Sequence, residues 1–397
     1  MDMSGRIMPF QIETRKSRPI ALVAIFVLVW ATIFLGLTFL RFPFMVYLEG
    51  VPTGWRPINI ATYPATGVTA LDFGDSFHGW IGGEDGLIMA TTDGGLSWAP
   101  QHSGINSSIQ AMDFFNADVG TVVSKRAEIL ITRDGGLSWI LLDDKRAPDG
   151  WWGTYLWDVV TTDENTAWVL GTRTFFRINI TNQSWNFVSN VSLALLDFTM
   201  VNNTHGWASG GFGNIIRTTT GWQSYEVQDA GVSTNFRDIF FWDDHRGWVV
   251  GYENSIFGTT DGGDHWVLQY RYRPFIPLEV PNALLDIEFI SESKGWAVGY
   301  YGIHVTENGG ATWTPLPDSS GPSSISFANE THGWAVGYRK EWSFRTTTGG
   351  ASFISENTIN SVVGVLTFVP LVVLPLIFVY RDYKKHQRWL MQDNNKN

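Results

Sequence analysis

The feature that most constrains the fold is a repeat of about forty residues that combines two short motifs. The first motif is a Gly-Trp pair or its remnant, and its copies begin at His78, Asp118, Thr166, His205, Arg246, Lys294 and His332. A second motif follows each copy at a regular distance, and TTDGGLSW at residues 91–98 is its clearest example. Two motifs that keep phase through seven copies predict seven four-stranded blades, because a period near ~40 residues is typical of a propeller blade.

Each repeat is predicted to form one four-stranded sheet. A short apolar strand, such as residues 285–290, precedes the Gly-Trp strand, a third strand leads into the second motif, and a fourth strand leaves it. A single sheet of this kind exposes two apolar faces, so the sheets must stack, and a closed ring protects their edges. The sequence therefore predicts an all-β fold, a seven-bladed β-propeller over residues 69–357.

The couplet of GWAVG and TxDGGxTW resembles the Asp-box, or BNR-repeat, propellers, and within them the photosystem II assembly/stability factor-like family. The copies in blades 1, 5 and 6 carry the resemblance best. It implies that the box residues are scaffold and that the function is assembly of a cofactor-bearing complex, with no catalytic site and no cofactor of its own. The box Asp is replaced in four blades, where we expect looser turns, by Ile180, Thr220, Asn308 and Thr348.

Composition narrows the class of protein further. The formal net charge is −11, and many of the basic residues flank two apolar segments near the ends, so the middle of the chain is acidic. An acidic middle argues against nucleic acid as a partner, because nucleic-acid binding needs a basic face. The chain has no cysteine, which excludes disulfides and thiol catalysis.

Two apolar segments predict transmembrane helices at residues 20–40 and 360–380. Each has about the twenty residues that span a bilayer core as a helix. The alternatives are a cleaved signal peptide for the first segment, although its apolar core is too long for one, and a buried core helix for the second. Both outer flanks are basic, so the positive-inside rule places both termini in the cytoplasm and the propeller outside it.

The predicted organisation is therefore that of a two-pass cell-membrane protein in contact with the lipid bilayer. Its parts are a cytoplasmic N-terminus (1–19), a helix (20–40), a linker (41–68), the propeller (69–357), a helix (360–380) and a cytoplasmic tail (381–397). In each blade, the 1–2 and 3–4 turns lie on one face of the ring, here called the box face. The 2–3 turns and the links between blades lie on the other, the link face. We expect both chain ends on the link face, held against the bilayer by a short spacer.

Two long links on the link face are rich in aromatic and basic residues. Such residues suit a protein interface and also the headgroup region of a bilayer. The candidates for this partner or membrane interface are Trp151, Trp152, Tyr155, Trp157, Arg271, Tyr272, Arg273 and Phe275. Docking on an integral membrane subunit, contact with headgroups and local packing are the three readings of these residues.

Acidic residues recur in the predicted innermost strands and form a candidate central-channel acidic ring, made of Asp72, Asp113, Asp158, Asp197, Asp238 and Asp286. Such a ring could hold a cation through oxygen ligands. The structural interpretation, which we favour, is that each carboxylate accepts backbone N–H groups within its own or the next blade. We predict no metal, because the histidines that precede Gly-Trp lie in widely separated turns.

Four sequons in predicted box-face turns are candidate glycosylation sites, at Asn179, Asn182, Asn202 and Asn329. The favoured function is a non-catalytic accessory or assembly subunit that docks on extracytoplasmic loops of integral membrane proteins. The alternative is a cell-surface module that binds glycan or envelope material. A sialidase-like enzyme would need converging arginines, whereas Arg177, Arg217 and Arg345 lie on predicted third strands.

Overall fold

The computed structural model describes the greater part of the predicted propeller. Its described residues are 54–57, 67–142, 155–271, 282–316, 321–337 and 343–350, and all belong to one compact unit, Pro52–Asn397. The predicted membrane segments, residues 20–40 and 360–380, lie outside the described residues. So do five of the interface candidates, namely Trp151, Trp152, Tyr272, Arg273 and Phe275. Among the described residues, no helix is both long and apolar enough to cross a membrane.

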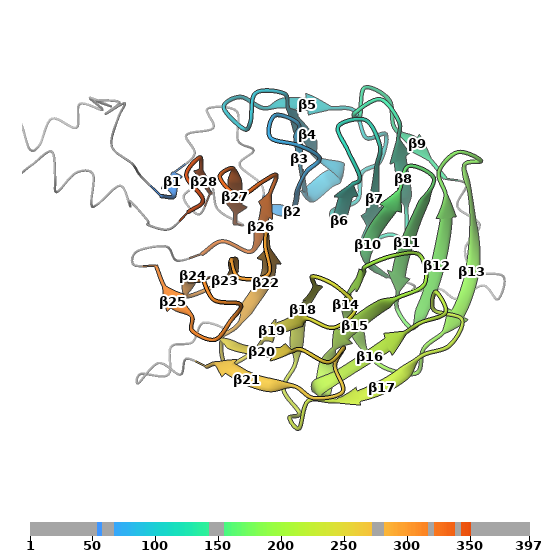
Figure 1. The fold of residues 1–397 in the computed structure, drawn as a ribbon. Coiled ribbons are helices and arrows are strands. Elements are labelled where there is room, and N and C mark those ends of the chain that lie inside the picture. Colours follow the sequence, from blue (N-terminus) through green and yellow to red (C-terminus); the bar gives the residue numbers. More distant parts are fainter. Residues whose placement is uncertain are drawn as a thin grey trace, which may run out of the picture. The chain divides into compact units, whose positions relative to one another are not determined.

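Seven antiparallel four-stranded sheets form a closed ring, which confirms the predicted seven-bladed propeller (Figure 1). The inner strands of blades 1 to 7 are β2 (Val68–Phe73), β6 (Ile109–Phe114), β10 (Leu156–Asp163), β14 (Leu195–Met200), β18 (Phe236–Phe241), β22 (Leu284–Phe289) and β26 (Ser324–Phe327). The second strands are β3 (Gly79–Gly83), β7 (Gly120–Ser124), β11 (Thr166–Gly171), β15 (Gly206–Gly210), β19 (Gly247–Gly251), β23 (Gly295–Gly299) and β27 (Gly333–Val336).

The outer half of each blade is built from the strands on either side of the second motif. The third strands are β4 (Ile88–Thr91), β8 (Ile129–Thr132), β12 (Thr174–Asn179), β16 (Asn214–Thr218), β20 (Ser255–Thr259), β24 (Gly302–Thr306) and β28 (Phe344–Thr346). The outermost strands are β5 (Ala99–Gln101), β9 (Ile140–Leu141), β13 (Ser184–Asn190), β17 (Glu226–Asp229), β21 (Val267–Tyr270), β25 (Thr314–Pro315) and, for blade 7, β1 (Arg56–Pro57). Two short 3-10 turns, η1 (Glu84–Gly86) and η2 (Gly211–Gly213), join second to third strands.

The Gly-Trp motif joins each blade to the next. Trp80 of blade 1 stacks on Phe114 of blade 2 with 3.5 Å between ring centroids, and the edge of that phenyl ring meets Trp139 from the box of blade 2. Gly79 precedes the tryptophan because a Cβ there would lie 2.3 Å from the ring of Phe73. Stacked aromatic pairs contribute beyond their buried area, so the motif binds neighbouring blades together.

Blade 2 lacks the Gly-Trp pair, and its neighbour compensates. Thr121 occupies the tryptophan position, and blade 3 carries Thr161 where five of the other blades have phenylalanine and blade 4 has Met200. The two hydroxyl oxygens lie 3.3 Å apart in a buried position, and a hydrogen bond replaces the aromatic stack.

The Asp boxes close the 3–4 turns through side-chain acceptors. Asp93 accepts the backbone N–H groups of Leu96 and Ser97, each at 2.9 Å. We expected looser turns where this Asp is replaced, and two of those blades differ from that expectation. Asn308 accepts the N–H of Thr312 at 2.9 Å, and Thr220 accepts that of Ser224 at 3.0 Å, because an amide or hydroxyl oxygen can serve equally as acceptor.

Blade 7 is completed by residues from the other end of the propeller's sequence. β1 pairs with β28 in the register Arg56↔Arg345 and Pro57↔Phe344, so its strand order is β1-β28-β27-β26 (Figure 1). Trp55, fully buried just before β1, meets Phe327 edge-on at 5.6 Å, as Trp98 meets Phe73 in blade 1. The ring therefore begins inside residues 41–68, which sequence analysis interpreted as a linker.

This closure changes which face carries the chain ends. Trp55 lies against Gly350 in the box of blade 7, where a Cβ on the glycine would be 2.5 Å from the indole nitrogen. The neighbouring Gly349 donates its N–H to the carbonyl oxygen of Thr331 in the 1–2 turn of the same blade, at 2.9 Å. Both ends of the ring therefore lie on the box face. The expectation that both ends lie on the link face is wrong. Because β1 supplies the outer strand of blade 7, the chain enters the ring one strand earlier and leaves it one strand earlier than predicted. Each strand runs from one face of the ring to the other, so both ends move to the box face.

Candidate functional site

The inner strands bring their carboxylates together around the channel in two tiers rather than in one ring. A β-bulge in each of blades 1 to 6 sets the common register, because its position is shared by the pairings of those inner strands. The lower tier, at the bulge, contains Asp158, Asp197, Asp238 and Asp286. The upper tier lies two residues further toward the box face and contains Asp72, Asp113 and Glu288.

Each carboxylate accepts the backbone N–H of the next blade's inner strand. In the upper tier, Asp72 accepts from Phe114 and Asp113 from Thr161, both at 2.6 Å. The other bonds join Asp158 to Phe198 (3.3 Å), Asp197 to Ile239 (2.9 Å), Asp238 to Ile287 (2.5 Å), Asp286 to Ile325 (2.8 Å) and Glu288 to Phe327 (3.1 Å). These bonds agree with the structural interpretation of the acidic residues, because each carboxylate joins its own blade to the next one.

Burial changes the protonation of these carboxylates. The channel wall desolvates Asp72, and with the nearby charge of Asp113 this raises the pKa of Asp72 to about 8. Desolvation likewise raises the pKa of Asp113 to about 6 and that of Asp158 to about 7. The pKa values of Asp197 and Asp286 are raised for the same first reason, with further repulsion from Asp238. At neutral pH several of these carboxyl groups are therefore partly protonated, and a protonated carboxyl group is a weaker ligand for a cation.

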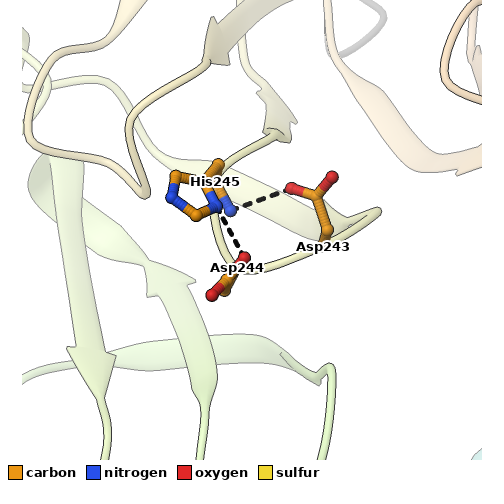
Figure 2. A group of neighbouring side chains, drawn as sticks. All are labelled: Asp243, Asp244 and His245. Atoms are coloured by element: carbon orange, nitrogen blue, oxygen red, sulfur yellow. Dashed lines mark hydrogen bonds and ion pairs between the residues drawn. The ribbon is translucent and has the colours of Figure 1, made fainter.

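A second acidic cluster lies in the 1–2 turn of blade 5, where Asp243, Asp244 and His245 approach one another (Figure 2). Asp243 accepts the backbone N–H groups of His245 and Arg246, and its second oxygen accepts the Arg246 guanidinium at 2.6 Å. Asp244 pairs with the Nδ1 atom of His245 at 2.6 Å. These contacts explain the cluster as a capped turn.

The histidines and sequon asparagines on the box face have similar turn roles. Asn202 accepts the N–H groups of Thr204 and His205, and Asn329 accepts those of Thr331 and His332. Asn179 accepts the N–H of Asn182 in the 3–4 turn of blade 3. The remaining histidine before a Gly-Trp pair, His78, contacts Asp75 at 2.9 Å. The three Gly-Trp histidines belong to blades 1, 4 and 7.

The three arginines considered for a sugar-binding cluster are separated. Arg177 lies over the ring of Trp168, 5.7 Å from its centroid. Arg217 pairs with Glu226 at 3.0 Å and Asp264 at 3.1 Å. All three, Arg345 included, lie on third strands as predicted, in blades 3, 4 and 7. The described residues contain no converging arginine cluster.

Aromatic and cationic side chains gather on the link face of blades 3, 4 and 5. Tyr155 and Trp157 lie with ring centroids 6.0 Å apart, and the N–H of Tyr155 donates to Thr172 in the 2–3 turn of blade 3. Of the remaining predicted interface residues described, Arg271 lies apart at the outer edge of blade 5, paired with Glu253 at 3.4 Å.

Three further residues extend this surface and were missed by sequence reasoning. Phe212, 78% exposed in η2, donates its N–H to Asn235 of blade 5. Beside Asn235 along the chain, the Arg237 guanidinium lies 5.1 Å from the ring centroid of Tyr252 and donates to its hydroxyl at 2.9 Å. A signal existed for Phe212 alone, since GGFG is a turn in which an apolar side chain has no strand to pack in. The link-face patch is defined as Tyr155, Trp157, Phe212, Arg237 and Tyr252.

Together these features define the class of protein, a closed Asp-box propeller whose channel carboxylates hold its blades together. Comparison with known proteins places it further. The sequence model of a family described as "Photosynthesis system II assembly factor YCF48" matches residues 51–150 and confirms the resemblance carried by the repeat couplet. No curated protein matches the sequence.

Solved structures with the same fold include two proteins of that name. "YCF48 bound to D1 peptide" aligns with a TM-score of 0.60 and 19% identity, over 76% of this chain and 98% of its own. "YCF48 from Cyanidioschyzon merolae" aligns with a TM-score of 0.60 and 17% identity, over 75% and 99%. The WD40 propeller domain of Doa1 aligns almost as well, with a TM-score of 0.57 and 12% identity over 74% and 96%. At these identities the likeness establishes the fold alone.

Proposed function

We propose that this protein is a non-catalytic, membrane-anchored accessory or assembly subunit of a membrane protein complex. In this proposal the link-face patch binds an extracytoplasmic loop or tail of an integral membrane partner. Both termini lie in the cytoplasm, and residues 20–40 and 360–380 cross the cell membrane. The family resemblance and the peptide bound by the similar YCF48 structure support a role in binding polypeptide.

The observation that carries the proposal is the contrast between occupied and exposed groups. The channel carboxylates are committed to backbone donors of neighbouring blades, and Arg217 to carboxylates on the rim. The rings of Tyr155 and Phe212 are instead exposed, and both residues lie on the link face, in blades 3 and 4. Tyrosine, tryptophan and arginine are enriched among the residues that contribute most to binding in protein interfaces, and aromatic rings bury large areas there.

The test is purification of the full chain from its own membranes in mild detergent. We expect integral membrane subunits in stoichiometric amount with the unmodified chain and their loss with a Tyr155→Ala/Phe212→Ala variant, because truncating such anchors costs about 1–3 kcal/mol each. The sequence-based interface candidates Trp151 and Trp152 are tested by the corresponding alanine pair. Val267→Ala/Leu268→Ala is the matched control, since these exposed side chains lie on the outer strand β21.

Retention of the same subunits by the Tyr155→Ala/Phe212→Ala variant would contradict docking at the link-face patch. An isolated monomer that binds glycan would instead favour the alternative of a cell-surface binding module. Because all variants change exposed side chains, their folding is checked by far-UV circular dichroism and by elution volume before partner content is compared.

A further inference from the structure

The positions of the two ends of the ring restrict how the ring can lie against a membrane. Trp55 and Gly350 lie together on the box face of blade 7. Nine residues separate Gly350 from the predicted helix at residues 360–380, and they reach at most ~30 Å when fully extended. A tether of this length can hold the face from which it leaves close to the bilayer. To hold the opposite face against the bilayer it would have to run past the full depth of the ring.

The same face carries a cluster of exposed apolar side chains in blades 1 and 2. Phe77 and Phe115 lie in 1–2 turns, and Leu96 and Leu137 occupy the position after the glycines of two Asp boxes. Leu137 is 89% exposed, and Phe77 and Leu96 are each 62% exposed. Blade 5 has Asp264 at the corresponding box position. Folding of the ring leaves these apolar side chains in water, so their burial is available to a second surface.

This cluster adjoins the blade from which both chain ends leave. The indole N–H of Trp334 in blade 7 donates to the carbonyl oxygen of Gly94 in the box of blade 1 at 3.0 Å. The acidic turn of Asp243 and Asp244 lies in blade 5, across the ring from blade 1 (Figure 1). The turns of blades 1 and 2 also carry carboxylates, such as Asp75 and Asp118, so these blades are distinguished by their exposed apolar side chains, which gain from burial at the headgroup boundary.

We propose that the box face of blades 1 and 2 rests on the lipid bilayer, with Phe77, Leu96, Phe115 and Leu137 inserted at its interface. The ring is then tilted, so that the acidic turn of blade 5 stays in water and the link-face patch points away from the membrane. This inference rests on the membrane attachment in the proposed function. It goes beyond that function by assigning the lipid-contacting face and by requiring that the partner segment extend above the ring.

The chain has no cysteine, so single substitutions give unique labelling sites. The full chain carrying Leu137→Cys, Leu96→Cys or Phe212→Cys is labelled with an environment-sensitive fluorophore and reconstituted in phosphatidylcholine vesicles. Labels at 137 and 96 are expected to emit at shorter wavelength and to lose about half or more of their emission to doxyl-labelled lipid, because inserted side chains lie ~5–10 Å below the surface. The label at 212, where a phenylalanine of the link face is 78% exposed, is expected to show neither change.

Quenching at 212 without quenching at 137 would overturn the proposal and return the link face to the membrane. Absence of quenching at all three sites would also overturn it, since the ring would then stand clear of lipid. The vesicles hold no partner protein, so both failures are separate from the test of docking at the link-face patch, which is the partner content measured in detergent. A Leu96→Ser/Leu137→Ser variant that keeps partner subunits but reduces quenching of a third label, at Phe77→Cys, supports the assignment independently of the labels at 96 and 137.

Discussion

Blades 1 and 7 have the same architecture but different chain connectivity. In blade 1 the box and the strand that follows it are continuous, and Ala90 pairs with Ala99. In blade 7 the corresponding pair is Arg345 and Arg56, which come from opposite ends of the propeller. The box tryptophan has the same edge-on contact in both, at 5.9 Å for Trp98 and 5.6 Å for Trp55. Packing within a blade therefore does not require a continuous chain, whereas connectivity decides the face from which the ends leave.

The largest expected effect is on stability, when the two tryptophans are compared. Trp98→Ala and Trp55→Ala should each lower the free energy of unfolding by about 3–5 kcal/mol, because each leaves a large cavity beneath a hairpin. Only Trp55→Ala should also loosen β1, since this strand has two residues paired with β28 and Trp55 is the buried side chain directly before it. Denaturant unfolding measures the first effect, and hydrogen exchange at β28 (Phe344–Thr346) measures the second.

A Trp55→Ala variant as stable as the unmodified protein would contradict closure by β1. Leu137→Ala is the control for the loss of a large apolar side chain, because Leu137 is exposed and should change stability by no more than ~0.5 kcal/mol.

The next effect concerns Asp72, which joins blade 1 to both of its neighbours. It accepts the N–H of Phe114 in blade 2 and the hydroxyl of Ser326 in blade 7. Asp72→Ala leaves a buried donor without a partner and should cost about 1–3 kcal/mol. Asp72→Asn keeps an acceptor oxygen and should cost much less at neutral pH. Thermal unfolding of the two variants in parallel distinguishes a lost bond from a lost charge.

The pH dependence of this contribution has a definite sign. Burial raises the pKa of Asp72 from its ordinary value to about 8, so between about pH 4 and 8 the native protein holds a proton that the unfolded chain has released. The stability contributed by Asp72 is therefore present at low pH and lost as the pH rises through 8. Asp72→Asn should flatten the fall in stability over this range. A variant with the slope of the unmodified protein would show that Asp72 is ionised in the native ring.

The smallest effect compares the boxes themselves. Asp93→Ala in blade 1 removes a turn acceptor and should cost about 1 kcal/mol, as the loss of a helix cap does. Hydrogen bonds from the turn outweigh desolvation and lower the pKa of Asp93, so its contribution is present above about pH 4 and lost as the pH falls. Thr348→Ala in blade 7 should cost less, because no carboxylate is lost. Urea unfolding at pH 7 and pH 3 measures both, and a larger cost for Thr348→Ala would break the comparison.

The repeat made the ring predictable from sequence. The Gly-Trp glycine is required because a phenyl ring covers it, and the box aromatic is required because it meets the same phenyl ring, as with Gly79, Phe73 and Trp98. Short-range motifs with a direct packing role fix the blade boundaries. The two tiers of carboxylates were harder to predict, because they depend on where each acid lies relative to the β-bulge that the blades share: Asp72 lies two residues beyond the position of Asp238.

The closing strand was missed because half of the seventh box is far away in sequence. The segment Gly54-Trp55-Arg56-Pro57 resembles Ser97-Trp98-Ala99-Pro100 of blade 1, so a signal was present. Phe353, which follows Gly350 at the usual distance, supplies an apparent box aromatic and masks this signal. No repeated motif marks the link-face patch, because Phe212 and Arg237 do not recur at the equivalent positions of the other blades. Only the fold brings their two blades together, through the hydrogen bond from the N–H of Phe212 to Asn235.

The most direct test of the central claim, that an N-terminal strand closes the ring, is an engineered disulfide between β1 and β28. Directly paired residues of antiparallel strands have Cα atoms about 4.5–5.5 Å apart, within the range of a disulfide. In the cysteine-free chain, Arg56→Cys/Arg345→Cys should cross-link under mild oxidation as completely as Ala90→Cys/Ala99→Cys, the equivalent pair in blade 1. Cross-linking of the blade 1 pair without that of the blade 7 pair would contradict the closure and, with it, the placement of both chain ends on the box face.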